Sequence, residues 1–334
     1  MPVRIPVAPD PENQERARRF FGLYELQTIL GPSPDPSYLG TKKPRHCRFC
    51  DQSSPEVTFK KVAHAIPDFL GNRNVFSYFE CDRCNAIFAR YEDSFANFLG
   101  ASRTFHQLRG KGNKVPKFKD KKNGLEVVMG EAALEMKSFE DHDPFTVDYA
   151  KRTLELVTER PGYVPLHVVK LLIKIGLTLL EPEEVAAYAT ASRFLLSETS
   201  DWRFLHNRML SIYGYAMPGP PIFRAPYAQL YTLKNTVETP AFDKQLVLFF
   251  ANYCFQLALP FGEVDKRLHG LTITNPRFPL ATNQDRLDKY GPAQVLTLDL
   301  TSAEKKKGET HTLSFSFDEA RKVPVLPSQE DFGA

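Results

Sequence analysis

The sequence predicts an α+β protein in which a small cysteine-rich module near the N-terminus precedes a larger α+β domain. Two C-x-x-C pairs enclose strand-like alternation, and a helical pattern follows the second pair. Beyond residue 145, helical and strand-like patterns both occur. With 334 residues, 42% of them apolar, the chain is long enough to bury the cores of two domains.

The patterns divide the chain into four segments. A helical stretch and a Pro-rich linker come first, and the cysteine-rich module follows them. A strand-like connector then leads into the last part, whose sequence indicates no particular chemistry. The expected segments are 1–43, helical and Pro-rich; 44–105, the cysteine-rich module; 106–144, a β-rich connector; and 145–334, an α+β domain of unknown role.

Periodicity predicts the individual elements within these segments. Gly100 suits a helix end and Pro182 a helix start, while the Asn123-Gly124 pair predicts a tight turn. Helical spacing predicts helices over 12–30, 82–100, 146–160, 164–180 and 181–196. Strand-like patterns predict strands over 57–67, 75–81, 133–139, 209–217, 225–233, 245–259 and 311–317.

Charge alone does not identify a partner. The net charge of +3 is too small to indicate nucleic-acid binding without a local patch. Basic runs occur at Lys42–Arg48 and Arg109–Lys122, and they fit either solvated loops or phosphate contacts. The apolar run Val164–Leu180 is too short and too charged to span a membrane, so we expect a core helix. No secretory pattern opens the sequence, and a cytoplasmic protein with reduced thiols is expected.

Four of the five cysteines form a pattern typical of a zinc site. Cys47 and Cys50 make one C-x-x-C pair, and Cys81 and Cys84 make the other after 30 intervening residues. Two such pairs complete a tetrahedral zinc ion and leave no position for a substrate, so the predicted zinc is structural. Cys254 lies in an apolar run and is predicted to be a core residue.

The order of these motifs resembles the HNH endonucleases, specifically the branch with two zinc knuckles. The first C-x-x-C pair precedes A-H-A-I-P, which contains His64, and the second pair runs directly into Asn85 at a helix start. The resemblance covers about residues 44–100 and implies a ββα-metal fold with a divalent cation, Mg²⁺ or Mn²⁺. It implies that His64 takes a proton from the attacking water, a role that suits an imidazole at neutral pH. It also implies that Asn85 contributes a ligand to that cation.

One position departs from the family pattern. The residue before the general base is commonly Asp, His or Glu, whereas here it is Ala63, which cannot bind a cation. Water, the phosphate or a nearby carboxylate would then have to complete the coordination of the cation. The carboxylates considered for this role are Asp68, Glu80 and Glu92.

Each of these residues also has a simpler interpretation. His64 fits a structural histidine beside a zinc knuckle, and Asn85 fits a helix N-cap. The asparagine that braces the loop between the two strands in this family is Asn72 or Asn74, and the spacing does not decide between them. Basic residues near the site fit either phosphate contacts or ordinary surface charge. They are Lys60, Lys61, Arg73, Arg83 and Arg90.

The resemblance implies a metal-dependent endonuclease that hydrolyses phosphodiester bonds of nucleic acid, with DNA as the expected substrate. By analogy with small nucleases that carry an extra domain, a role in bacterial defence is expected, and the C-terminal domain is the expected site of self-association or of a regulatory partner. Ala63 favours an alternative, a catalytically inactive, zinc-stabilised protein that binds nucleic acid or acts as an adaptor. In a third interpretation the zinc module only stabilises the fold, and the C-terminal domain carries the function.

Overall fold

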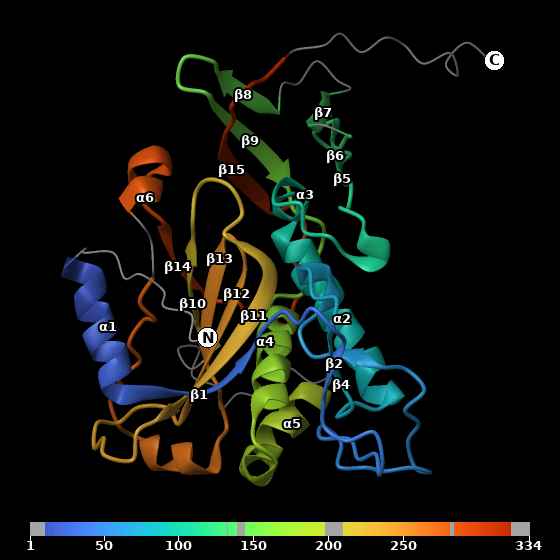
Figure 1. The fold of residues 1–334 in the computed structure, drawn as a ribbon, viewed down its shortest axis with the longest axis vertical. Coiled ribbons are helices and arrows are strands. Elements are labelled where there is room, and N and C mark those ends of the chain that lie inside the picture. Colours follow the sequence, from blue (N-terminus) through green and yellow to red (C-terminus); the bar gives the residue numbers. More distant parts are fainter. Residues whose placement is uncertain (1–10, 132, 139–143, 198–209, 281–283, 322–334) are drawn as a thin grey trace.

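The part of the chain that the structure, a computed structural model, describes comprises residues 11–131, 133–138, 144–197, 210–280 and 284–321. Within these residues the predicted α+β fold is confirmed: a six-stranded sheet lies at the centre, and three-stranded sheets lie around it (Figure 1). No helix in this part of the chain is long and apolar enough to cross a membrane.

The central sheet joins strands from distant parts of the chain. Its order is β1-β11-β12-β13-β10-β14, and every neighbouring pair is antiparallel. The innermost strands β12 and β13 turn around Asn252, and β12 is buried along its whole length because both faces of the sheet are covered. The strands are β1 (Tyr24–Leu30), β10 (Ile212–Ala216), β11 (Phe223–Leu233), β12 (Lys244–Ala251), β13 (Tyr253–Ala258) and β14 (Gln294–Leu298).

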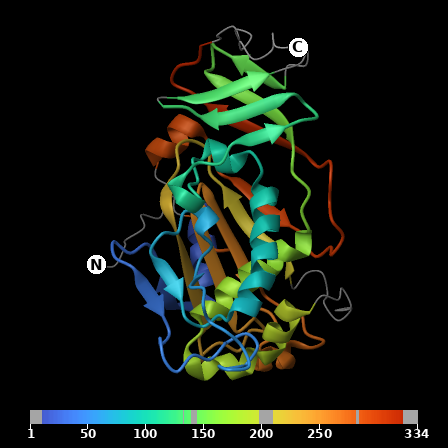
Figure 2. The ribbon, with the colours of Figure 1, turned by 90° about the vertical axis from the view of Figure 1, so that its right-hand side faces the viewer.

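Two long helices, α2 (Asp82–Leu99) and α4 (Pro165–Leu179), cover one face of this sheet and pack against each other (Figure 2). Helix α4 begins at Pro165, whose fixed φ suits the first helical position. Apart from His167, all its residues are buried, which confirms the predicted core helix. The polar side chains of α4 are therefore buried together with the apolar ones, and they need hydrogen-bond or ion-pair partners inside the protein.

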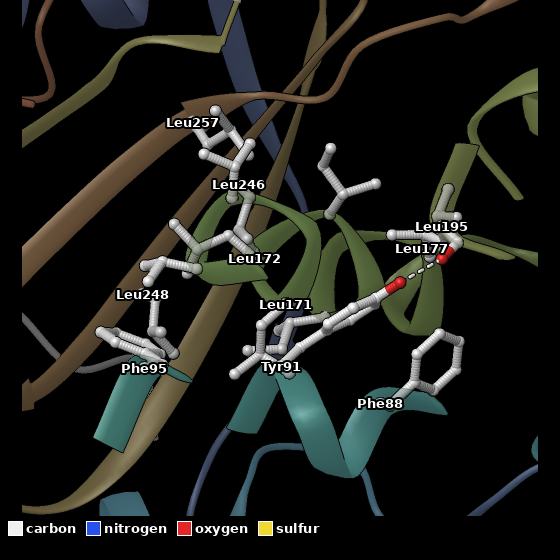
Figure 3. Packing of buried hydrophobic residues seen from close by; sticks show 14 of the residues in the cluster. Phe88, Tyr91, Phe95, Leu171, Leu172, Leu177, Leu195, Leu246, Leu248 and Leu257 are labelled. Atoms are coloured by element: carbon white, nitrogen blue, oxygen red, sulfur yellow. Dashed lines mark hydrogen bonds between the residues drawn. The ribbon is translucent and has the colours of Figure 1, made fainter. Parts of the chain in front are cut away.

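The packing between these layers forms the largest hydrophobic cluster of the described chain. Figure 3 shows Phe88, Tyr91 and Phe95 of α2 lying against leucines of α4 and of the central sheet. The hydroxyl of Tyr91 donates a hydrogen bond of 2.5 Å to the carbonyl of Leu195 in α5 (Ala189–Leu196). The cysteine-rich segment is thus joined to the rest of the protein by a continuous apolar core.

Helix α1 (Pro11–Leu23) covers the opposite face of the central sheet. The ring of Phe20 lies 5.1 Å from the rings of both Tyr231 and Phe278, measured between centroids. Cys254 is buried in this same layer, which confirms its predicted place in the core. Burial between two apolar layers explains why the middle of this sheet lacks the polar alternation of a half-exposed strand.

The cysteine-rich segment carries a small sheet of order β2-β4-β3, in which β2 runs parallel and β3 antiparallel to β4. A short turn, η1 (Asp68–Leu70), lies in the loop between β3 and β4, and α2 follows β4. The predicted order of strand, loop, strand and helix is therefore confirmed. The strands are β2 (Ser37–Leu39), β3 (Ala63–His64) and β4 (Val75–Ser77).

Two further three-stranded sheets pack together at the far end of the molecule (Figure 2). Their contact is apolar and includes Leu125, Val127, Leu156 and Leu313. The sheets consist of β5 (Phe118–Asp120), β6 (Leu125–Met129) and β7 (Leu134–Ser138), and of β8 (Phe145–Asp148), β9 (Thr153–Glu159) and β15 (Thr310–Ser316). The remaining short helices are α3 (Ser102–Phe105), η2 (Lys111–Asn113), η3 (Pro182–Tyr188), η5 (Glu263–Leu268) and α6 (Gln284–Tyr290).

The helix predicted over 146–160 is wrong, because these residues form the hairpin of β8 and β9. In β9 the buried side chains alternate with more exposed ones, so Leu154 and Leu156 face the same side of the sheet, as a period of two requires. The turn between the strands is held by Asp148, whose carboxylate accepts a 2.9 Å hydrogen bond from the backbone N–H of Lys151. This local hydrogen bond favours the turn over a helix.

Several other elements are shorter than predicted, including the strand predicted over 75–81, which is limited to Val75–Ser77. The helix predicted over 12–30 ends at Leu23, and the chain continues as β1 because the following residues pair with β11. The strand predicted over 57–67 is limited to Ala63–His64. The turn predicted at Asn123-Gly124 is confirmed between β5 and β6, where Gly124 adopts a φ of 57°.

Candidate functional site

The four cysteines of the two C-x-x-C pairs come together at one point. Their Sγ atoms all lie within 4.8 Å of one another. The Sγ atoms of Cys47 and Cys84 are 3.7 Å apart, and those of Cys50 and Cys81 are 3.8 Å apart. Disulfides require about 2.05 Å, whereas a tetrahedral ion with Zn–S bonds of about 2.3 Å places its sulfurs about 3.8 Å apart. The sulfur positions therefore fit a Cys₄ zinc site.

Tight turns set this geometry at both pairs. The backbone N–H of Asp51 donates to the carbonyl of Cys47 at 2.9 Å, closing the first knuckle. Cys81 is the N-cap of α2, and its Sγ accepts a 3.5 Å hydrogen bond from the backbone N–H of Cys84. The N-cap interpretation of Asn85 is therefore wrong, because its own N–H donates to the Cys81 carbonyl at 2.9 Å within the helix.

Metal analysis is expected to find one zinc ion per chain. Replacement of Cys84 by serine removes a thiolate from the site and is expected to lower the zinc content well below one. The matched control is Cys254→Ala, because this thiol is buried in the layer on the other side of the central sheet and should leave the zinc content unchanged. Full zinc occupancy in Cys84→Ser would contradict the Cys₄ assignment.

His64 stands at the end of β3, where the loop towards β4 begins. Asn72 braces this loop: its amide nitrogen donates to the carbonyls of Ile66 at 2.6 Å and Val75 at 2.8 Å, and its Oδ1 accepts from the Val75 N–H at 3.0 Å. Asn74 instead donates to backbone carbonyls of the Pro-rich segment. The structure thus identifies Asn72 as the bracing asparagine.

The same arrangement leaves His64 able to accept a proton. Its Nδ1 lies 3.5 Å from the amide nitrogen of Asn72, but an amide nitrogen carries only two protons. Both protons already go to the carbonyls of Ile66 and Val75. Asn72 therefore does not occupy the lone pair on Nδ1.

The surroundings of His64 favour the neutral imidazole. Burial lowers its pKa below the usual 6.5, and the charges of Lys174 and Arg73 lower it further, whereas the carboxylate of Asp68 opposes the shift. Because the pKa lies below 6.5, the ring is neutral at pH 7. A neutral imidazole is the form that a general base needs.

A buried lysine of α4 is hydrogen-bonded to the strand that contains His64. The Nζ atom of Lys174 donates a 3.0 Å hydrogen bond to the His64 carbonyl and lies 3.0 Å from Oε2 of Glu80. The side chains of Lys174 and Glu80 are each only 1% exposed. Glu80 directly precedes Cys81, so this lysine links the end of β3 to the second zinc knuckle, and the carboxylate of Glu80 is already paired.

The residue before the candidate base points away from it. Ala63 pairs with Ser77 and is 4% exposed, whereas His64 pairs with Phe76, so the two side chains lie on opposite faces of the small sheet. Within the described residues, the cysteines are the only group of three or more Cys, His, Asp or Glu side chains close enough to hold an ion. A second cation would therefore need other ligands, such as a carboxamide, water or phosphate.

Three candidate ligands for such a cation remain. The carboxamide of Asn85 makes no hydrogen bond with any other described residue, and Glu92 follows two turns later on the same face of α2. Burial raises the pKa of Glu92 to about 7, the neighbouring carboxylates add to the rise, and Lys174 opposes it. Asp68 lies in η1, 4.0 Å from a guanidinium nitrogen of Arg73. Oxygen donors of this kind suit Mg²⁺ or Mn²⁺.

The five basic residues proposed for phosphate contact do not form one cluster. Lys60 and Lys61 lie side by side before β3, where their backbone N–H groups each bind the Asp82 carboxylate at 2.9 Å and their side chains are exposed. Arg73 lies in the braced loop and donates to the carbonyl of Arg109. Their proximity to β3 favours contacts near the candidate site.

The other two basic residues lie on α2. Arg83 is exposed in its first turn, beside Cys50 of the zinc site. Arg90 is exposed two turns later and lines a cavity of about 260 Å³ with Tyr91, His167 and Lys170. Of the five basic residues, Arg90 is thus associated with the packing of α2 on α4 and not with the loop around His64.

Sequence reasoning missed the role of Lys174. The polar residues of the core helix recur three or four apart, and this spacing identifies a shared face but not what the face meets. A lysine in a helix with so many apolar neighbours is a signal for a buried ion pair, because an unpaired buried ammonium group is costly. Its partner, Glu80, could be found only from the packing of α2 and α4.

Comparison with known families agrees with this geometry. Residues 47–98 match the family model of the HNH endonucleases. No match was found among curated proteins or among solved structures. The matched segment begins at the first zinc cysteine, contains β3, the braced loop and β4, and ends within α2.

This match indicates nuclease activity and metal binding, and it agrees with the motifs that the sequence presents between the two C-x-x-C pairs. The strand, loop, strand and helix of the structure, with cysteines before the first strand and at the helix start, occur in the order that the resemblance implied. The segment 47–98 is therefore similar to the HNH endonucleases, and its four cysteines form a candidate zinc site.

Proposed function

We propose that the protein is a metal-dependent endonuclease that hydrolyses phosphodiester bonds of DNA, with His64 as the general base. The observation that carries this proposal is the neutral imidazole of His64. Its Nδ1 receives no proton from Asn72, because both protons of the Asn72 amide are donated to backbone carbonyls. His64 lies within the segment that matches the HNH endonucleases. The zinc site is proposed to be structural, since four thiolate ligands leave no position for a substrate.

In this mechanism Nδ1 of His64 takes a proton from a water molecule aligned with the scissile phosphorus. The water oxygen forms a bond to phosphorus as the bond to the leaving oxygen breaks, and the leaving oxygen takes a proton from solvent. Asp68 then stabilises the imidazolium, because its charge favours the protonated ring. A bound Mg²⁺ or Mn²⁺ would neutralise charge on the phosphate, and Asn85, Asp68 and Glu92 are the residues proposed to hold it.

Cleavage of plasmid and oligonucleotide DNA tests this proposal. Wild-type protein is expected to nick supercoiled plasmid when Mg²⁺ or Mn²⁺ is added and to leave it intact without added cation. Chelators are avoided, because they would also remove the structural zinc. Intact DNA under every divalent cation, with zinc fully bound, would reject the nuclease.

The acid limit of cleavage is expected to lie below pH 6.5. Because the folded-state pKa of His64 is depressed, its base form persists as the pH falls to 6.5 and is lost only below that value. Rate constants measured at saturating Mn²⁺ should therefore decline with a midpoint below 6.5. A decline with a midpoint near pH 7 that disappears in Glu92→Gln would place the limiting ionisation on Glu92, whose pKa is about 7.

The position of Ala63 favours a second candidate, an inactive zinc-stabilised protein that binds nucleic acid or acts as an adaptor. Alanine supplies no ligand, and its side chain faces the interior. Binding of DNA without cleavage would support this candidate. For either function, the remaining domain is proposed as the surface for self-association or for a regulatory partner, and defence against foreign DNA is the proposed biological setting.

A further inference from the structure

A row of planar side chains crosses the outer face of the small sheet and ends at His64. The order is Arg45, Tyr78, Tyr38, Phe76 and His64, and we name this set the aromatic stack. The guanidinium carbon of Arg45 lies 4.9 Å from the ring centroid of Tyr78, and the ring centroids then follow at 4.9, 5.2 and 4.9 Å. The rings of Tyr38 and Tyr78 are nearly parallel, with an angle of 9° between their planes.

The strand register places these side chains together. Phe76 of β4 pairs with Tyr38 of β2 on one side and with His64 of β3 on the other. Residues 76 and 78 share a face of β4, while Val75 and Ser77 face the interior and are buried. The stack is thus a property of the sheet, and His64 is its last member.

Strand β2 pairs with the segment that matches the HNH endonucleases, but it lies outside that segment in the sequence. The match to the HNH endonucleases begins at residue 47, whereas Tyr38 lies in the preceding Pro-rich segment. Tyr38 is nevertheless the middle ring of the stack, and 45% of its surface is exposed. Cross-strand aromatic contacts stabilise a short sheet, but stabilisation alone does not require a ring that remains so exposed.

The charge around the stack is mainly positive. Residues 37–79, which contain the three strands and their flanks, carry seven Lys and Arg residues and three acidic residues, Asp51, Glu56 and Asp68. Arg48 points inwards, where it donates to backbone carbonyls at the end of α4. Four of the others are exposed lysines that form no ion pair with a described residue. They are Lys42, Lys43, Lys60 and Lys61.

We propose that the aromatic stack and these lysines bind single-stranded DNA and guide it to His64. Unpaired bases stack on exposed aromatic rings while the backbone follows cationic side chains, whereas the bases of a duplex are already stacked inside the helix. Two observations favour this partner: the net positive charge of the surface, which suits a phosphate backbone, and the exposed ring of Tyr38, on which a base can stack. The inference rests on the proposed function, because it assigns the strandedness of the substrate for the same site.

Fluorescence anisotropy without added Mg²⁺ or Mn²⁺ measures this binding separately from cleavage. The probes are a fluorescein-labelled single-stranded DNA oligonucleotide, the matching DNA duplex and the RNA of the same sequence. Wild-type protein is expected to bind the single-stranded DNA most tightly. Tyr38→Ala is expected to weaken that binding about tenfold, the effect of losing one stacking ring, whereas Tyr38→Phe keeps the ring and should bind like wild type.

The control is Tyr149→Ala, because Tyr149 is 58% exposed but lies in the turn between β8 and β9, far from the small sheet (Figure 1). Zinc content and circular dichroism verify that each variant is folded. Equal affinity of Tyr38→Ala and wild type, or duplex binding as tight as single-strand binding, would overturn the inference. Equal or tighter binding of the RNA would overturn the assignment to DNA. Tyr38-dependent binding without any cleavage would instead reject the nuclease and leave the binding surface intact.

Discussion

Replacing Lys174 by methionine is expected to lower the free energy of unfolding by about 3–5 kcal/mol, the usual effect of removing one partner from a buried ion pair. Methionine keeps the length of the side chain but leaves the carboxylate of Glu80 buried without its counter-charge. It also removes the hydrogen bond to the His64 carbonyl. Urea denaturation monitored by circular dichroism measures the loss.

A second replacement separates the ion pair from simple packing. In Lys174→Met/Glu80→Leu both charges are gone, and most of the lost stability should return because no charge remains buried alone. The surface control is Lys266→Met, because Lys266 pairs with Glu263 but its side chain is 73% exposed. Its effect should stay within about 1 kcal/mol. If the double variant is as unstable as Lys174→Met, the ion pair does not explain the destabilisation.

The parts of the site that depend on local sequence could be predicted without the structure. Both zinc knuckles follow from the C-x-x-C spacing, because two residues between the cysteines place both sulfurs on one side of a tight turn. Helix α2 follows from its apolar periodicity, and its end from Gly100. His64 and Asn85 could be placed only by resemblance to a family, because a lone histidine or asparagine has no local signature.

The features that depend on distant contacts could not be predicted. The sequence spacing does not distinguish Asn72 from Asn74. Their hydrogen bonds do, because Asn72 bonds to the loop between β3 and β4, whereas Asn74 bonds to the Pro-rich segment. Lys174 and Glu80 are far apart in sequence, and so are Tyr38 and His64. Their encounters require the packing of α2 on α4 and the parallel pairing of β2 with β4. Tertiary contacts of this kind leave no periodic trace in a single sequence.

Replacing His64 by alanine is expected to lower the rate constant for phosphodiester cleavage by about 10²–10⁴-fold, the usual contribution of a general base. The variant should remain folded, because the loop is braced by Asn72 and the Lys174 hydrogen bond is made by the backbone carbonyl of residue 64. The matched control is His269→Ala, since His269 is exposed at the end of η5 and is not part of the candidate site.

The role of His64 is tested by the single-turnover rate of cleavage of single-stranded DNA at pH 7 with Mn²⁺, measured for wild type, His64→Ala and His269→Ala at equal zinc content. Wild type and His269→Ala are expected to cleave at similar rates, and His64→Ala is expected to cleave about 10²–10⁴-fold more slowly. Equal rates for His64→Ala and wild type would show that the imidazole of His64 is not the base, and no cleavage by any of them would contradict the nuclease itself.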